Sequence, residues 1–163
     1  DNQCILEIGT NLGVSGSYML EGMKSKNGKL VTMEGLPQLC EISARQFSTI
    51  ASVSNFQIVE GLYDETFSKV IEKGLKYNLI FIDGNHKKEP TIKYFNALKT
   101  NVDQAAIFVF DDIYWSKGMK EAWQFIKNDQ DVNFSIDMYE LGVVIIDKGE
   151  SLHKKHFSLH LAY

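Results

Sequence analysis

The sequence of 163 residues predicts an α/β fold, in which a mostly parallel sheet carries helices on both of its faces. Apolar runs of strand length alternate along the chain with segments that have helical periodicity. Two of these runs, 78–82 and 105–110, are almost uninterrupted, as is typical of central strands that helices cover on both sides. The last two runs, 132–138 and 142–147, are joined by a tight turn, which predicts antiparallel neighbours.

The first half of the chain contains three predicted strand–helix pairs. The first apolar run ends in a turn that contains glycine, and Pro37 directly precedes the second helix. Asp64 is suited to cap the third helix at its N-terminus, and Gly74 is suited to end it. The predicted strands of this half are 4–8, 29–33 and 56–59, and its predicted helices are 11–24, 38–50 and 64–74.

The second half contains two further helices between its apolar runs. Ile92, Phe95 and Leu98 have the spacing of one helix face, which predicts a helix over 90–101. The segment 116–128 repeats this pattern. Because neither a repeat nor a linker interrupts the alternation, we expect a single domain over residues 1–163.

Composition restricts the classes of partner. The formal net charge of −4 argues against nucleic acid, because phosphate binding needs a basic surface. The sequence contains no run near the ~20 apolar residues of a membrane span, and we expect no signal peptide. Cys4 and Cys40 lack metal or redox spacing, so we expect reduced thiols in a cytoplasmic protein. The chain starts without Met directly before a strand, which leaves an N-terminal extension open.

The loop after the first strand carries the first binding signal. In open α/β sheets ligands bind at the carboxyl ends of the strands, and here the sequence reads Glu7-Ile-Gly9-Thr-Asn-Leu-Gly13-Val-Ser15-Gly. Its glycines let a backbone approach a ligand, and the following helix offers its positive N-terminal end. The spacing differs from the G-x-G-x-x-G of dinucleotide enzymes, and Glu7 would repel a pyrophosphate. An amino-acid ammonium or a sulfonium would be attracted instead; a plain tight turn is the alternative.

Two further loops complete this predicted binding edge. Glu34 ends the second strand, where a carboxylate can accept hydrogen bonds from the two hydroxyls of a ribose. Leu62 and Tyr63 follow the third strand, and either side chain could pack on a nucleobase or belong to the core.

Acidic residues follow the fourth and fifth strands. Asp83 and His86 come after the fourth strand, and Asp111 and Asp112 after the fifth. Three carboxylates at one place repel one another, so they require a metal ion, a cationic ligand or raised pKa values. Oxygen ligands suit Mg²⁺ or Ca²⁺, whereas a histidine can take a proton from a hydroxyl group. Each residue could also simply cap a helix or lie in a surface loop.

The four motifs L-E-I-G-T-x-x-G-x-S, V-T-M-E-G, F-I-D-G-N-H and F-D-D-I-Y-W-S together resemble class I S-adenosylmethionine-dependent methyltransferases. The likeness spans residues 5–147 and is greatest to the O-methyltransferase branch related to catechol O-methyltransferase. It implies a Rossmann-like sheet of seven strands with an antiparallel last strand. The cofactor-binding residues that it implies or that the loops predict are Glu7, Gly9, Thr10, Asn11, Gly13, Ser15, Glu34, Gly35, Leu62, Tyr63 and Asp83.

The resemblance also implies a metal site and a catalytic base. The family places metal-binding acids at Asp83, Asp111 and Asp112, but the third is Asn in the family pattern. The family's catalytic Lys falls on His86, which we expect to act as the base with Asp83 beside it. Tyr114 and Trp115 follow on a loop, where they could wall the substrate or pack on the sheet.

The predicted activity is therefore methyl transfer from S-adenosylmethionine to a hydroxyl group of a small molecule, with Mg²⁺ as an optional cofactor. A nicotinamide-dependent oxidoreductase and a non-catalytic cofactor-binding domain are the alternatives. The sequence leaves the acceptor and a homodimer open.

Overall fold

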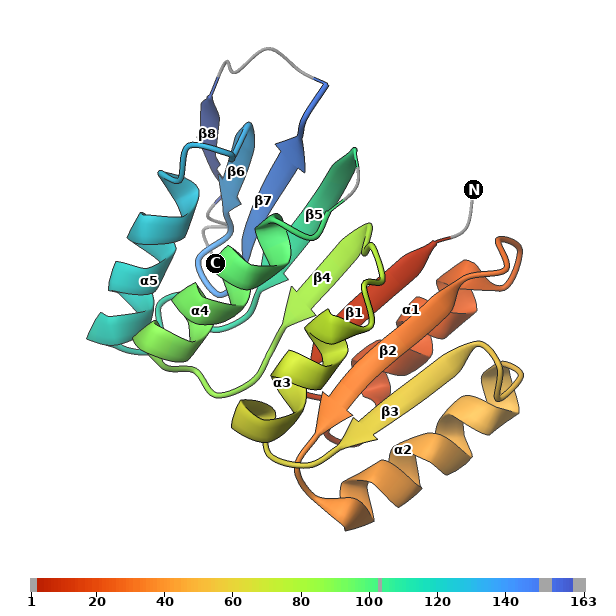
Figure 1. The fold of residues 1–163 in the computed structure, drawn as a ribbon. Coiled ribbons are helices and arrows are strands. Elements are labelled where there is room, and N and C mark those ends of the chain that lie inside the picture. Colours follow the sequence, from red (N-terminus) through yellow and green to blue (C-terminus); the bar gives the residue numbers. More distant parts are fainter. Residues whose placement is uncertain (1–2, 103, 150–153, 160–163) are drawn as a thin grey trace. The chain divides into compact units, whose positions relative to one another are not determined.

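The computed structural model describes residues 3–102, 104–149 and 154–159. The chain divides into two compact units, residues 1–77 and 78–163. Each unit contains its own strands and helices, and the strand order within each is visible in Figure 1.

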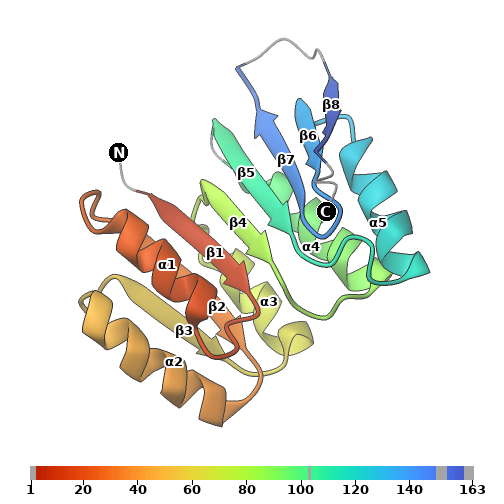
Figure 2. The same cartoon turned by 180° about the vertical axis from the view of Figure 1, so that it is seen from behind.

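The first unit has three parallel strands in the order β3-β2-β1. Helices α1 and α2 pack on each other on one face of this sheet, and α3 lies on the other face (Figures 1 and 2). The unit confirms the first three predicted strand–helix pairs. Its elements are β1 (Cys4–Ile8), α1 (Val14–Met23), β2 (Lys29–Glu34), α2 (Pro37–Ile50), β3 (Phe56–Glu60) and α3 (Tyr63–Glu72).

The second unit has five strands in the order β4-β5-β7-β6-β8. Strands β4 and β5 are parallel, and β7 runs antiparallel to both β5 and β6. The antiparallel pairing of β6 and β7 confirms the prediction made from the tight turn that joins these two strands. Helices α4 and α5 pack together on one face of the sheet (Figure 2). The elements are β4 (Leu79–Ile82), α4 (Lys88–Lys99), β5 (Ala105–Phe110), α5 (Lys117–Lys127), β6 (Phe134–Asp137), β7 (Gly142–Asp147) and β8 (Lys155–Ser158).

Three elements differ from the sequence prediction. Helix α3 begins at Tyr63 with Leu62 as its N-cap, so Asp64 lies in the first turn and does not cap the helix as predicted. Helix α1 begins at Val14 rather than at residue 11, because Asn11 and Gly13 have left-handed φ values of 48° and 77° that a helix cannot contain. An eighth strand, β8, pairs in parallel with β6 beyond the seven that were expected. All four side chains of β8 are exposed, so this strand lacks the apolar pattern by which buried strands are recognised.

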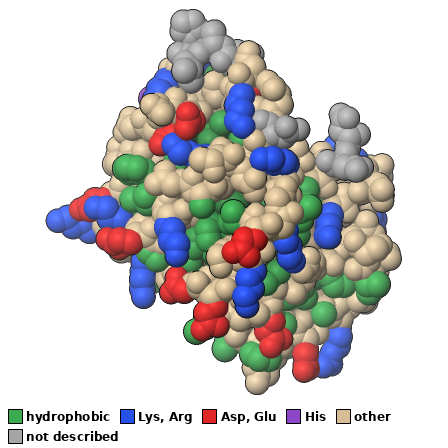
Figure 3. All heavy atoms as spheres, in the orientation of Figure 1, with side chains coloured by type: hydrophobic (Ala, Val, Ile, Leu, Met, Phe, Trp, Pro, Cys, Tyr) green, Lys and Arg blue, Asp and Glu red, His purple; other side chains and the backbone are tan. Residues whose placement is uncertain are grey.

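The surface charges, the two cysteines and the lengths of the helices bear on the expectations drawn from composition. Basic and acidic side chains are interspersed over the face shown in Figure 3. Neither Cys4 nor Cys40 forms a disulfide, and burial raises the pKa of both thiols. Within the described ranges, no helix is both long enough and apolar enough to cross a membrane.

Candidate functional site

Three loops of the first unit meet at one edge of its sheet. They follow β1, β2 and β3, and because these strands are parallel, their carboxyl ends lie at the same edge. The backbone N–H of Gly61 donates to the carbonyl of Glu34 at 2.9 Å, which ties the third loop to the second. The structure thus brings together the predicted cofactor-binding residues that precede Asp83.

Glu7 is the buried centre of this edge. Its carboxylate is inaccessible to solvent and accepts hydrogen bonds from the hydroxyl of Ser15 on one oxygen and from Thr32 Oγ1, at 2.6 Å, on the other. Burial raises the pKa of Glu7, while these two hydrogen bonds act to lower it. None of the ion pairs found among the described residues includes Glu7. The edge therefore contains a buried acid whose hydrogen-bond partners are neutral hydroxyls.

Glu34 organises the first two loops. Its carboxylate is 7% exposed and accepts the backbone N–H of Asn11 on Oε2 and that of Leu36 on Oε1, both at 2.9 Å. A carboxylate oxygen can accept two hydrogen bonds, so each oxygen retains capacity for a ligand hydroxyl. This geometry suits the predicted contact with a ribose.

The glycines of the first loop have a structural role that the sequence prediction did not include. A Cβ at Gly13 would lie 2.8 Å from Ser43 Cβ, and one at Gly16 would lie 2.6 Å from Phe47 Cζ. Both positions therefore allow α1 to pack closely on α2, and Gly13 also has the left-handed backbone that precedes the helix. A Cβ at Gly35 would meet its nearest atoms at an ordinary 3.9 Å, so packing in the protein does not require this glycine.

Apolar side chains project from the same edge. Leu36 is 57% exposed and Leu62 is 64% exposed, and each follows the end of a strand, whereas Tyr63 is half-buried at the start of α3. Leu36 was missed from the sequence, although its position directly after Gly35 was the available signal. Together with Leu62 it offers apolar surface on which a flat base could pack.

The loops after β4 and β5 in the second unit place a histidine between two aspartates. His86 Nε2 lies 3.7 Å from Asp83 Oδ1, and His86 Nδ1 lies 3.5 Å from Asp112 Oδ2. Each of the three side chains is about one-third exposed, at 32%, 32% and 34%. Asn85, His86 and Asp112 all have positive φ values, of 71°, 34° and 57°. Such strain in residues other than glycine gathers at functional sites.

The expected set of three metal-binding aspartates does not form here. Asp111 Oδ1 instead accepts the backbone N–H of Asp112 at 3.0 Å, so this carboxylate binds the backbone of its own loop. Asp83 and Asp112 contact different nitrogens of the His86 ring rather than a shared point. In the part of the chain that the structure describes, no three His, Cys, Asp or Glu side chains are arranged to hold a metal ion. The donor geometry therefore does not fit the predicted Mg²⁺ site.

The two aromatic residues after the acid pair have different environments. Tyr114 donates its hydroxyl to Asp137 at 2.8 Å and stacks on Tyr139 with a centroid distance of 5.4 Å. These contacts pack Tyr114 against the turn that follows β6. Trp115, in the loop that follows β5, is 74% exposed.

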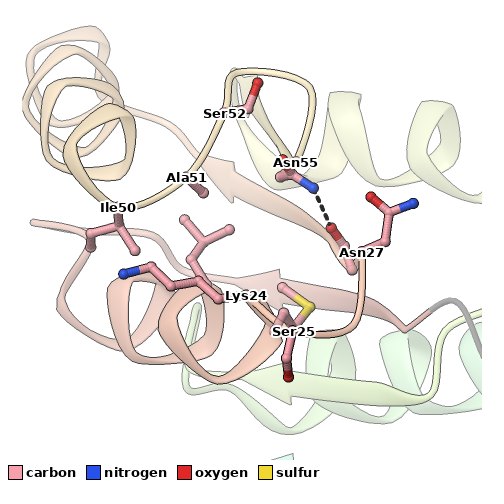
Figure 4. A pocket seen from close by; sticks show the side chains of 10 residues that line it. Lys24, Ser25, Asn27, Ile50, Ala51, Ser52 and Asn55 are labelled. Atoms are coloured by element: carbon pink, nitrogen blue, oxygen red, sulfur yellow. Dashed lines mark hydrogen bonds between the residues drawn. The ribbon is translucent and has the colours of Figure 1, made fainter.

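Two of the pockets in the described structure differ in their relation to this site. One, of about 450 Å³, includes His86 among its lining residues and lies between the starts of α4 and α5. Another, of about 620 Å³, lies at the amino ends of β2 and β3, away from the predicted site (Figure 4). Its wall includes Lys24, Ser25, Asn27, Ile50, Ser52 and Asn55.

Comparison with known proteins identifies relatives of this chain. A family profile described as a methyltransferase domain matches residues 6–113. The catechol O-methyltransferase of Niastella koreensis is 32% identical over 92 residues, which cover 56% of this chain and 40% of that protein. Protein R132 of Acanthamoeba polyphaga mimivirus is 30% identical over 122 residues, covering 69% and 52%. The chain thus spans about half, or less, of the length of these curated relatives.

Solved structures share the fold. Cofactor-bound Rv0187 from MTB superimposes with a TM-score of 0.76 at 19% identity, covering 91% of this chain and 74% of that one. The O-methyltransferase TomG of Streptomyces achromogenes, solved with SAM, gives a TM-score of 0.76 at 20% identity, covering 90% and 74%. These likenesses confirm the Rossmann-like α/β fold class across nearly the whole chain.

Proposed function

This chain belongs to the methyltransferase domain family, and on that premise we propose that it binds S-adenosylmethionine and transfers its methyl group to a hydroxyl of a small molecule. The observation that carries the proposal is the pair of buried carboxylates, Glu7 and Glu34, at the carboxyl edge of the first unit's strands. Neither takes part in an ion pair found among the described residues, so no basic side chain there neutralises their charge.

Each part of the cofactor has a chemically suitable partner in the first unit. The carboxylate of Glu7, when ionised, provides the negative field that favours an ammonium or a sulfonium beside the loop from Gly9 to Ser15. Glu34 has remaining acceptor capacity for the two ribose hydroxyls. Leu36 and Leu62 offer exposed apolar surface to the adenine, and Gly35 leaves room beside them.

His86 is the proposed base. When bound, the cofactor supplies a methyl group on a sulfonium, which a hydroxyl oxygen of the acceptor can attack. A ring nitrogen of His86 receives the hydroxyl proton as the oxygen–carbon bond forms. Asp83 and Asp112 flank the ring, so they orient it and stabilise its positive charge once it is protonated. No step passes through Mg²⁺, because no group of three ligating side chains forms among the described residues.

The cofactor half of the proposal is tested by calorimetric titration of the chain with S-adenosylmethionine and, separately, with NAD. We expect saturable binding of the first and none of the second, because Glu7 disfavours a pyrophosphate at this loop. Binding of NAD without binding of S-adenosylmethionine would contradict the proposal.

The transfer half is tested with His86→Ala, with catechol as the acceptor probe and release of S-adenosylhomocysteine as the measurement. The loss of a general base should slow turnover by roughly 100-fold to 10,000-fold while cofactor affinity stays unchanged. His156→Ala, on the exposed strand β8, is the matched control and should keep the full rate. An unchanged rate in His86→Ala would reject His86 as the base.

A further inference from the structure

A chain of hydroxyl groups lies behind the proposed cofactor loop. Thr32 is fully buried in β2, directly opposite Glu7 in the strand register. Its Oγ1 lies 2.6 Å from Glu7 Oε2 and 2.5 Å from the hydroxyl of Thr10, which is also buried. Ser15 reaches the other carboxylate oxygen from the first turn of α1.

The direction of these hydrogen bonds follows from the number of protons. An ionised carboxylate only accepts, and a threonine hydroxyl has one hydrogen to donate. Thr32 therefore donates to Glu7, and Thr10 must donate to Thr32. The network runs from Thr10 through Thr32 to Glu7, with Ser15 donating from the opposite side.

This network connects the carboxylate to the loop that is proposed to hold the ligand. Thr10 lies in that loop, next to Asn11, whose backbone N–H binds Glu34. Without the Thr32 hydroxyl, Glu7 Oε2 would lose its donor and Thr10 its acceptor, both in a place that water does not reach. Buried groups without partners cost free energy, and a movement of the loop would lower that cost.

We propose that Thr32 is a positioning residue of the S-adenosylmethionine site, which acts through Glu7 and Thr10 to hold the carboxylate and its loop in the geometry that receives the amino-acid end of the ligand. This inference rests on the proposed function. Sequence reasoning did not single out Thr32, because a β-branched residue inside a strand has an ordinary explanation in its strand preference.

The test compares Thr32→Val with Thr32→Ser, because valine keeps the volume and loses the hydroxyl, whereas serine keeps the hydroxyl. Two probes are titrated calorimetrically: S-adenosylhomocysteine, and 5′-methylthioadenosine, which lacks the amino-acid part. Thr91→Val is the matched control, since Thr91 is also buried but donates to the carbonyl of Lys87, the N-cap residue of its own helix.

We expect Thr32→Val to weaken S-adenosylhomocysteine binding by about 10-fold, the effect of one unsatisfied buried group, and to leave 5′-methylthioadenosine binding unchanged. Thr32→Ser should restore the affinity, and Thr91→Val should bind both probes like the parent chain. If Thr32→Val does not fold, Thr10→Val removes only the outer donor and should show the same selective loss, reduced in size.

Three outcomes would overturn the inference: equal S-adenosylhomocysteine affinity in Thr32→Val and the parent, equal losses for both probes, or a Thr32→Ser variant as weak as Thr32→Val. The second outcome would mark a general structural role, and the third would assign the effect to the methyl group. Failure of the parent chain to bind either probe is a separate result, because it rejects the proposed function itself.

Discussion

The burial of Glu7 costs folding stability when its carboxylate is ionised, and the same carboxylate has a proposed role in binding. Its carboxylate is fully buried, and the hydroxyls of Ser15 and Thr32 are its hydrogen-bond donors. Desolvation outweighs these bonds and raises its pKa. The folded chain therefore binds the Glu7 proton more tightly than the unfolded chain does. Such a group adds stability at low pH, and its contribution falls as the pH rises from the unfolded pKa to the folded one.

The variant Glu7→Gln removes this titration. We expect the free energy of unfolding of Glu7→Gln, minus that of the parent, to increase as the pH rises from about 4 towards neutrality. Urea denaturation at several pH values measures this difference. A difference that stays constant, or that decreases with pH, would show that the carboxylate is not destabilised by burial.

Position in the sequence identified the two carboxylates of the proposed cofactor site, but it did not identify their hydrogen-bond partners. Glu7 and Glu34 were found because each lies at the end of a predicted strand, which is a local property. Thr32 acts across 25 residues of sequence, and the geometry of the sheet creates that contact. Asp111 follows a strand end like Asp112 but turns towards its own backbone, which sequence position could not distinguish.

Helix α1 illustrates what glycine does within an element. Gly13 ends the loop in a left-handed conformation against α2, whereas Gly22 lies exposed near the other end of the helix, where an added Cβ would meet nothing within 4 Å. In sequence both glycines lie within the predicted helix 11–24, and only Gly13 belongs to a motif. Their surroundings predict opposite effects of substitution.

We expect Gly13→Ala to lower the free energy of unfolding by about 2–4 kcal/mol, because it combines left-handed strain with a close contact to Ser43. Gly22→Ala should raise the free energy by about 0.5–1 kcal/mol, since alanine favours the helix and restricts the unfolded chain. Urea denaturation of both variants checks the pair. Equal effects, or a stabilising Gly13→Ala, would contradict this account of the loop.

At the scale of the molecule, the two units carry different parts of the proposed chemistry. The first unit holds the loops assigned to the cofactor, and the second holds His86 between its two aspartates. This division matches the order of the motifs along the chain. The three aspartates that were predicted to bind a metal ion, Asp83, Asp111 and Asp112, all belong to the second unit.

We expect removal of divalent cations with EDTA to leave the proposed transfer rate unchanged within about twofold, because Asp83 and Asp112 face different nitrogens of His86 and no group of three ligating side chains forms among the described residues. Release of S-adenosylhomocysteine before and after chelation measures this. A loss of rate that added Mg²⁺ restores would contradict it and would require these side chains to rearrange.

The sequence by itself determined the type and order of the elements, because apolar periodicity and turn residues act between neighbours in the chain. It also determined which polar residues follow each strand, and therefore which ones meet at one edge of a parallel sheet. Only the tertiary structure decided the partners of these residues. Thr32 donates to Glu7, Gly13 packs against Ser43, and Asp111 accepts the backbone N–H of Asp112, and each of these contacts depends on the fold in three dimensions.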